Sequence, residues 1–199
     1  GFVGVDVFFV ISGFLISSII FRELEDGRFS LKEFYVRRIR RIFPALICLM
    51  IVGGFLGWYI LLPDEFMQLG KHIAAGNGFI SNIILWQEAG YFDNSSETKP
   101  LLHLWSLGIE EQFYFIWPIS LALVWRSRRG VLTLTLSIAL LSFVTSLYAL
   151  KTYSSATAFY LPMYRFWELM VGGFLAYVVA YKKWPYPTNK LLVNILSLL

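Results

Sequence analysis

A stripe of ionisable, hydroxyl and aromatic side chains runs through the apolar segment 101–118. Its members recur every three or four residues: His103, Ser106, Glu110, Tyr114 and Trp117. On a helix this spacing places them on one face. A histidine beside a carboxylate is a common pair for moving a proton, and a hydroxyl can stabilise developing charge. The stripe therefore indicates acid–base chemistry, with Glu110 and His103 as candidate catalytic residues.

Glu110 is a carboxylate in an otherwise apolar predicted helix, so its position there requires a physical reason. Glu111 falls on the neighbouring stripe, so we expect Glu110 to face the protein interior alongside His103. An ionised carboxylate in hydrocarbon is costly unless it is paired, and such residues usually line cavities or pathways. A Glu110 that is only protonated, or only paired with an arginine, is the structural alternative. An acid, a histidine and a tyrosine on one face favour function.

Asp6 and Ser12 lie in a second apolar segment, GFVGVDVFFVISGFLI, at 1–16. Asp6 is expected at the outer edge of a membrane span, where composition alone favours an interfacial acid in contact with water. The functional alternative makes Asp6 a further catalytic carboxylate. Ser12 and Gly13 indicate a small-residue face that is suited to close helix packing.

Arg165 and Glu168, in the segment YRFWELMVGG, are three residues apart. On a helix they can simply neutralise each other at the outer end of a span. Alternatively, Arg165 is the counter-ion of Glu110 or Asp6, which would bring three helices to one polar centre.

A dense basic cluster, FYVRRIRRIFP, occupies 34–44, and we expect it to end near the start of the next helix. From composition it is a positively charged anchor at the cytoplasmic face. Its arginines also pair at i,i+3 spacing, Arg37 with Arg40 and Arg38 with Arg41. Two such guanidinium pairs could grip the anionic oxygens of a phosphate-bearing cofactor or of a lipid headgroup.

Composition indicates what kind of protein holds these residues. Of 199 residues, 57% are hydrophobic and only 15% are charged, whereas soluble domains are about a quarter charged. A single cysteine excludes a disulfide framework and a CxxC metal site. The net charge of +4 comes from membrane-flanking loops, so no nucleic-acid partner is expected.

The elements that must position the polar residues are apolar segments of about 20 residues, the length that crosses a bilayer. The predicted spans are 5–21, 42–62, 104–125, 131–150 and 161–181, with a truncated sixth from Leu191. The predicted fold class is therefore all-α, a polytopic membrane helical bundle. We expect one domain over 1–199, cut at both ends, with about five complete spans and one short re-entrant or interfacial segment.

Loop charge predicts the topology. Segment 72–86 is short and polar enough to span, re-enter or lie in the interface. If it does not cross, one side of the membrane collects thirteen Lys and Arg residues, in the segments 22–41, 126–130 and 182–190. If it crosses, the split falls to nine against seven. Cytoplasmic loops are rich in Lys and Arg, so the first topology is favoured, with 63–103 and 151–160 outside.

Taken in order, these motifs resemble the acyltransferase 3 family of membrane acyltransferases. The matching stretches are GFVGVDVFFVISGFLI, FYVRRIRRIFP, PLLHLWSLGIEEQFYFIWP and RFWELMVGG, over roughly 1–175. The long HLWSLGIEEQFYFIWP form is most similar to the bacterial branch that O-acylates cell-surface polysaccharides. In that branch a periplasmic SGNH hydrolase-type domain often follows the membrane part.

The resemblance implies transfer of an acyl group, commonly acetyl, from cytosolic acyl-CoA. The implied acceptor is a hydroxyl of a glycan at the outer face, such as lipopolysaccharide O-antigen or peptidoglycan. The expected partners are the lipid bilayer of the bacterial inner membrane, the acyl-CoA donor, the glycan and an SGNH domain beyond Leu199. No bound cofactor is expected.

The resemblance also implies roles for residues. Arg37, Arg38, Arg40 and Arg41 match the family's Arg-x-x-Arg loop, which is suggested to contact the donor. Glu110 matches the acid of the motif WSL-x-x-E-x-Q-F-Y. Asp6, Ser12 and Gly13 match the motif GVD-x-F-F-x-x-SG.

The implied catalytic histidine belongs to an Arg-x10-His motif on a preceding helix, before Gly1. His103 is not that residue, and the chain by itself is expected to be inactive. In the implied mechanism that histidine takes the acceptor proton while Glu110 or Asp6 orients its ring. Direct transfer and a covalent acyl-enzyme both stay open.

Two other classes of function compete with the enzyme. A proton-coupled transporter or flippase would use Asp6, Glu110, His103 and Arg165 as a path through the membrane. Its usual sequence pointer is a pair of interrupted helices in two related halves, and no such repeat is present. A non-catalytic scaffold would leave the polar stripe unexplained.

Overall fold

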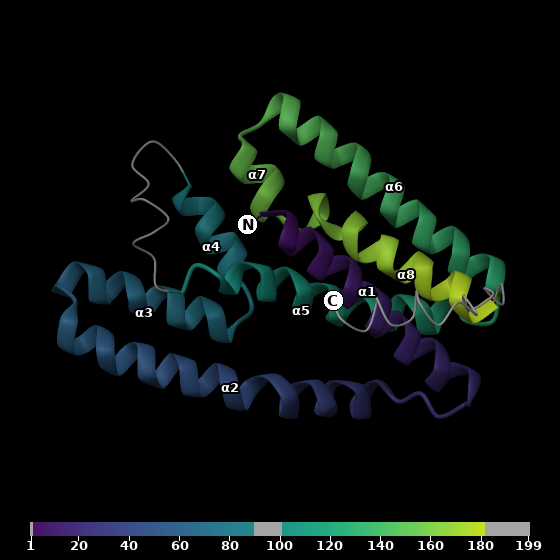
Figure 1. The fold of residues 1–199 in the computed structure, drawn as a ribbon, viewed down its shortest axis with the longest axis horizontal. Helices are drawn as coiled ribbons and strands as arrows, with labels where there is room; N and C mark the ends of the chain where they lie inside the picture. The colour runs from purple at the N-terminus through teal and green to yellow at the C-terminus, as the bar shows by residue number, and fades with distance from the viewer. Residues whose placement is uncertain (1, 90–100, 182–199) are drawn as a thin grey trace, which may run out of the picture.

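The computed structural model describes residues 2–89 and 101–181, and every regular element in these ranges is helical (Figure 1). The elements are α1 (Phe2–Glu25), α2 (Leu31–Ile60), α3 (Pro63–Asn77), α4 (Ser81–Glu88), α5 (Leu104–Val124), α6 (Arg128–Thr152), α7 (Ser155–Tyr160), η2 (Pro162–Tyr164) and α8 (Phe166–Tyr181). The predicted all-α membrane bundle is confirmed for the described residues. The basic segment 182–190 and the predicted sixth span from Leu191 lie outside them.

The five predicted spans are all helical, but they differ in how well each is suited to cross a bilayer. Three helices are long and apolar enough by length and composition: Val3–Glu25, Leu31–Ile60 and Arg128–Thr152. The helix α8 is apolar but has only 16 residues. The helix α5 has 21 residues and carries Glu110, Glu111 and Gln112 in its apolar sequence.

The start of α2 corrects one predicted boundary. The helix begins at Leu31 instead of 42, because Ser30 caps it: the Ser30 hydroxyl accepts a hydrogen bond from the Glu33 amide at 3.4 Å. The basic cluster is therefore helical and not a loop. Pro44 lies inside this helix and not near its start.

The helices α1 and α8 are in backbone contact through glycines. A Cβ atom added to Gly13 would lie 1.9 Å from the carbonyl oxygen of Leu169, and one added to Gly172 would lie 2.0 Å from that of Val10. Small residues allow helix backbones to approach this closely inside a membrane. The predicted small-residue face at Gly13 is confirmed.

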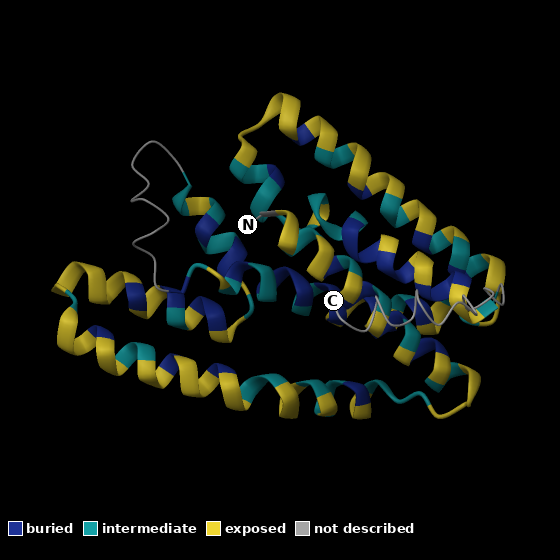
Figure 2. Ribbon diagram, viewed as in Figure 1, coloured by how far each residue is buried: buried dark blue, intermediate teal, exposed yellow. Residues whose placement is uncertain are grey.

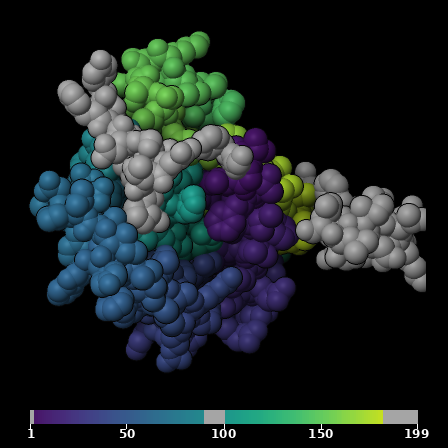
Figure 3. Space-filling view, turned by 60° about the vertical axis from the view of Figure 1, so that its left-hand side comes forward, coloured from purple at the N-terminus to yellow at the C-terminus, as the bar shows by residue number. Residues whose placement is uncertain are grey.

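The rest of the bundle forms around this pair and α5. Figure 3 shows α6 and α7 on one side of α1 and α5, and α2 and α3 on the other. The largest fully buried side chains come mostly from the central helices, among them Phe9, Ile16, Trp117, Leu121, Leu169 and Met170. The outer helices α2 and α6 are largely exposed (Figure 2) and carry many exposed apolar side chains, the pattern expected of helices that face lipid.

One end of the bundle gathers the predicted basic segments. Phe21 of α1 stacks on Trp125 at 5.9 Å between ring centroids, and the guanidinium of Arg128 lies 4.6 Å from the ring of Tyr181. The end of α1, the start of α6 and the end of α8 therefore lie together (Figure 1). The loop-charge topology requires segments 22–41 and 126–130 to lie on one side, and this geometry agrees with it.

Segment 63–88 is a helical hairpin, so the uncertain 72–86 is not one helix. The helix α3 runs back along α2, the chain turns at Gly78–Ile80, and α4 returns toward the end from which α3 came (Figure 1). At the turn Phe79 has a positive φ of 54°. The turn packs on α5, where a Cβ atom on Gly108 would lie 3.1 Å from the Phe79 carbonyl oxygen.

A turn before α8 corrects the second predicted boundary and orients Arg165. Within the predicted span 161–181 the α-helix begins only at Phe166, because the short 3-10 helix η2, which starts at Pro162, precedes it. The Arg165 Nη2 atom lies 2.6 Å from Asp6 Oδ1 and 3.2 Å from Glu168 Oε2. Arg165 therefore pairs with Glu168, as their spacing predicts, and also with Asp6, one of the two alternative counter-ions; the second pair ties the start of α1 to the start of α8.

Gly172→Ala should force α1 and α8 apart, because the added methyl group meets the α1 backbone, which cannot move like a flexible side chain. We expect a loss of about 1–3 kcal/mol of stability. Thermal unfolding in detergent, followed by size-exclusion chromatography after heating, measures the effect. The matched control is Gly53→Ala, also within an apolar helix but with open space around its Cβ position. Equal melting temperatures for the two variants would contradict the close α1–α8 contact.

Arg165→Gln should leave Glu168, which is 1% exposed, without its counter-charge. Removing one partner of a buried ion pair lowers the free energy of unfolding by about 3–5 kcal/mol. Adding Glu168→Gln to the same chain should recover part of the lost stability, because the uncompensated charge is removed. The same unfolding assay tests this, with the exposed Arg129→Gln as control. A double variant less stable than Arg165→Gln would contradict the pairing.

Candidate active site

The helix α5 presents its two carboxylates to different neighbours. Glu110 hydrogen-bonds to Ser12 of α1, whereas Glu111 Oε1 lies 3.9 Å from Arg38 Nη1 of α2. Consecutive residues on a helix of 3.6 residues per turn are about 100° apart, so adjacent acids cannot share a face. Both faces are nonetheless covered, because α5 has helices packed on several sides.

Three buried polar side chains form one cluster between α1 and α5. The hydroxyls of Ser12 and Tyr114 both donate hydrogen bonds to Glu110 Oε1, and the two hydroxyls also lie in contact with each other. The three residues are between 3% and 7% exposed. Ser12 therefore has two roles: it is a small residue on the helix face, and its hydroxyl donates a hydrogen bond to Glu110. The predicted placement of Glu110 and Tyr114 on one interior face is confirmed.

Arg38 connects this cluster to a cavity on the other side of Tyr114. Its guanidinium carbon lies 3.7 Å from the centroid of the Tyr114 ring, and its side chain is 16% exposed. Glu111 Oε1 is buried and has no hydrogen-bond partner. The same tyrosine thus touches the arginine with its ring and Glu110 with its hydroxyl.

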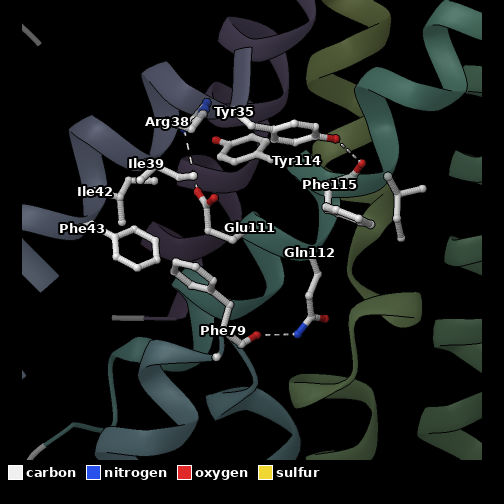
Figure 4. Close-up of a pocket in the computed structure, with 12 residues that line it drawn as sticks. Tyr35, Arg38, Ile39, Ile42, Phe43, Phe79, Glu111, Gln112, Tyr114 and Phe115 are labelled. Carbon is white, nitrogen blue, oxygen red and sulfur yellow. Dashed lines mark hydrogen bonds and ion pairs between the residues drawn. The ribbon is translucent and has the colours of Figure 1, made fainter. Parts of the chain in front are cut away.

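The cavity lies between α2, α5 and the tip of the α3–α4 hairpin and has a volume of about 510 Å³. Figure 4 shows Arg38, Tyr35 and Tyr114 toward one end and Phe43 and Phe79 toward the other. Its remaining walls are Ile39, Ile42, Gly78, Glu111, Gln112, Phe115 and Ile116. A volume of a few hundred Å³, mostly apolar walls and a few fixed polar groups are typical of sites for small ligands.

Gln112 fixes the hairpin tip against α5. Its Nε2 atom donates to the Phe79 carbonyl oxygen at 2.8 Å and to Asn82 Oδ1 at 2.9 Å. Asn82 is fully buried and donates in turn to the Tyr160 carbonyl oxygen at 3.0 Å. Side-chain hydrogen bonds therefore hold the hairpin tip against α5 and the start of α4 against Tyr160.

The four predicted donor-binding arginines do not act as two equivalent pairs. Arg38 alone lines the cavity. Arg37 turns toward α1, where its Nη2 atom lies 2.6 Å from Glu23 Oε1. Arg40 and Arg41 are exposed on the same turns of α2.

The predicted catalytic residues Asp6, Glu110 and His103 do not meet in one centre. Asp6 pairs with Arg165, near the aromatic rings of Phe9, Trp105 and Phe159, which lie 5.5–5.9 Å from the guanidinium. His103 is exposed at the N-cap of α5. Seven residues separate it from Glu110, about 10 Å along a helix axis, so a shared stripe did not bring them into contact.

Glu111, Gln112 and Tyr35 are site residues that the sequence reasoning missed. Helical spacing places Glu111 on the neighbouring face and indicates no role for it, yet it lines the cavity opposite Arg38. The available signal was the run Glu110–Gln112: three adjacent polar residues in an apolar helix need partners on three sides. Tyr35, whose hydroxyl donates to the Phe115 carbonyl oxygen at 2.8 Å, gave no comparable signal.

The site is suited to holding an elongated, partly anionic ligand beside buried hydroxyl groups. Among the described residues, no three His, Cys, Asp or Glu side chains are grouped as metal ligands. Hydroxyl donors and a carboxylate in a water-poor site can orient a proton acceptor and stabilise a carbonyl that becomes negatively charged.

Comparison with known proteins agrees with this chemistry. A family described as an acyltransferase domain matches residues 1–198. An uncharacterized protein of Haemophilus influenzae is 43% identical over 178 residues, which cover 86% of this chain and 73% of that protein. The peptidoglycan O-acetyltransferase OatA of Listeria monocytogenes is 37% identical over 193 residues, 94% of this chain and 30% of that protein.

A Staphylococcus aureus protein that is provisionally named an O-acetyltransferase is 43% identical over 123 residues, which are 61% of this chain and 20% of that protein. The chain thus spans less than a third of the length of the relatives whose names state an activity. No solved structure matches it. Because the family match covers almost the entire chain, this protein belongs to the acyltransferase 3 family of membrane acyltransferases.

Proposed function

We propose that this protein transfers an acyl group, acetyl in the first instance, from acyl-CoA to a hydroxyl group of a glycan outside the cytoplasmic membrane. The observation that carries the proposal is the position of Tyr114 between the cavity and the buried cluster. A donor in the cavity would lie beside the tyrosine that holds Glu110. The name of the Listeria relative supports an O-acetyl group and a glycan acceptor.

The donor enters from the end of the cavity that carries Arg38. Arg40 and Arg41, exposed on the same helix, supply further positive charge for the CoA phosphates. Guanidinium groups suit this role because they bind phosphate oxygens bidentately. The pantetheine arm then runs along the apolar walls of α2 and α5, past Glu111 and Tyr114.

In the chemical step the acceptor oxygen attacks the thioester carbonyl carbon. The C–S bond breaks, the thiolate of CoA leaves, and the hydroxyl proton passes through a base to the thiolate sulfur. The base implied by the family resemblance is a histidine outside the described residues. Glu110, held in place by the hydroxyls of Ser12 and Tyr114, orients that base and stabilises its protonated form.

The proposed orientation follows the distribution of charge. The end of the bundle with segments 22–41 and 126–130 faces the cytoplasm and acyl-CoA. The opposite end, with the Asp6–Arg165 pair, faces outward and receives the glycan. The Asp6–Arg165 pair then shapes the outer entrance to the site and takes no direct part in the acyl transfer.

Glu110→Gln should lower glycan acylation about 100-fold or more, because the amide keeps a hydrogen-bond acceptor for Ser12 and Tyr114 but removes the charge that supports the base. Membranes that contain the full-length protein are supplied with radiolabelled acetyl-CoA, and label in the glycan is counted. The control is Asp64→Asn, an exposed acid in the first turn of α3. Wild-type labelling by Glu110→Gln, at equal abundance in the membrane, would remove Glu110 from the mechanism.

Arg38→Gln should raise the KM for acetyl-CoA about tenfold or more, since a hydrogen bond to a charged group contributes about 1.5–3 kcal/mol. The neighbouring Arg37→Gln is the matched control: that guanidinium faces Glu23 of α1 and not the cavity. Its KM should change by less than that of Arg38→Gln. Equal shifts in the two variants would show that the cluster attracts the donor by general charge and not through the cavity.

A further inference from the structure

We propose that Phe79, together with Phe43, closes the cavity at the end opposite Arg38 and so limits the length of the acyl chain that the enzyme accepts. The proposal rests on the proposed function, because it takes the acyl tail of the donor as the occupant of that end. It assigns a specificity role to the tip of the α3–α4 hairpin.

The cavity has a polar end and an apolar end. Arg38 and Glu111 face each other at 3.9 Å, whereas the rings of Phe43 and Phe79 meet edge to face at 5.8 Å between centroids (Figure 4). If the arginines hold the CoA phosphates, the pantetheine arm places the thioester and its acyl tail at the end of the cavity away from them. The tail therefore points toward the two phenylalanine rings.

Phe79 reaches this position through an unusual backbone conformation. Its φ of 54° lies in the left-handed region, which a bulky side chain rarely adopts. Glycine would fit such a turn without strain. Gln112 holds the Phe79 carbonyl oxygen at 2.8 Å, and Gly108 leaves room for the tip on α5. Strain that is held in place in this way suggests a role for the side chain.

An apolar end that is walled by two phenylalanine rings discriminates chain lengths by exclusion. One methylene group more or less in such a pocket changes kcat/KM by about 10–200-fold. Removing a phenylalanine ring opens space for several methylene groups beyond an acetyl group. The enzyme should then use longer tails better relative to acetyl-CoA than the wild type does.

The test compares acetyl-CoA, butyryl-CoA and hexanoyl-CoA as donors for the full-length protein in membranes. We expect the wild type to prefer acetyl-CoA. In Phe79→Gly, which removes the ring and suits the positive φ, the ratio of kcat/KM for butyryl-CoA to that for acetyl-CoA should rise about tenfold or more.

Two further variants complete the design. Phe43→Ala opens the same end of the cavity from α2 without altering the hairpin turn, so it decides the question if Phe79→Gly fails to accumulate. Phe55→Ala is the control, an exposed phenylalanine farther along the same helix and 74% exposed. Its donor preference should equal that of the wild type.

Several results would overturn the proposal. An unchanged ratio in both phenylalanine variants, with acetyl transfer intact, would reject the chain-length role and leave the proposed function standing. Equal increases with all donors would identify the hairpin tip as a gate and not as a length limit. A wild-type protein that transfers no acyl group from any acyl-CoA would reject the proposed function and this inference together.

Discussion

A carboxylate in an apolar helix has little water to solvate it, so its partners must come from neighbouring helices. This constraint decides how α5 is placed. Glu110 requires the hydroxyls of α1 and of its own next turn, and Glu111 requires the guanidinium of α2. Because the two acids are adjacent, their partners lie on different sides, and α5 becomes the centre of the bundle.

The close contact of α1 with α8 serves the same constraint. Ser12 can reach Glu110 because α1 is held in place by the contacts at Gly13 and Gly172 and by the Asp6–Arg165 pair at its N-terminal end. Two polar centres therefore share α1 but differ in character. The centre around Arg165 is an ion-pair tie between helix ends, and the centre around Glu110 joins hydroxyls to a carboxylate beside a cavity.

The hairpin α3–α4 brings irregular backbone to the middle of the bundle. Backbone groups in such a turn must be satisfied by protein, since lipid offers no hydrogen bonds. Gln112 supplies that bond to the Phe79 carbonyl oxygen, so the third polar residue of the Glu110–Gln112 run also has a defined partner. The same contact holds the hairpin tip as one wall of the cavity. A change that destabilises the turn should therefore also change the shape of the site.

The sequence by itself determined the helical class, the small-residue face at Gly13, the interior position of Glu110 with Tyr114 and the pairing of Arg165 with Glu168, while it left open whether Arg165 also meets Asp6 or Glu110. These features follow from helical periodicity, which is a property of a single helix. They also follow from the free-energy cost of leaving a charge unpaired in an apolar environment. Only the tertiary structure decided that His103 lies away from Glu110, that Arg38 and not Arg37 faces the cavity, and that Glu111 is a site residue. The physical reason is that periodicity fixes which residues share a face, whereas the packing of other helices fixes what each face meets.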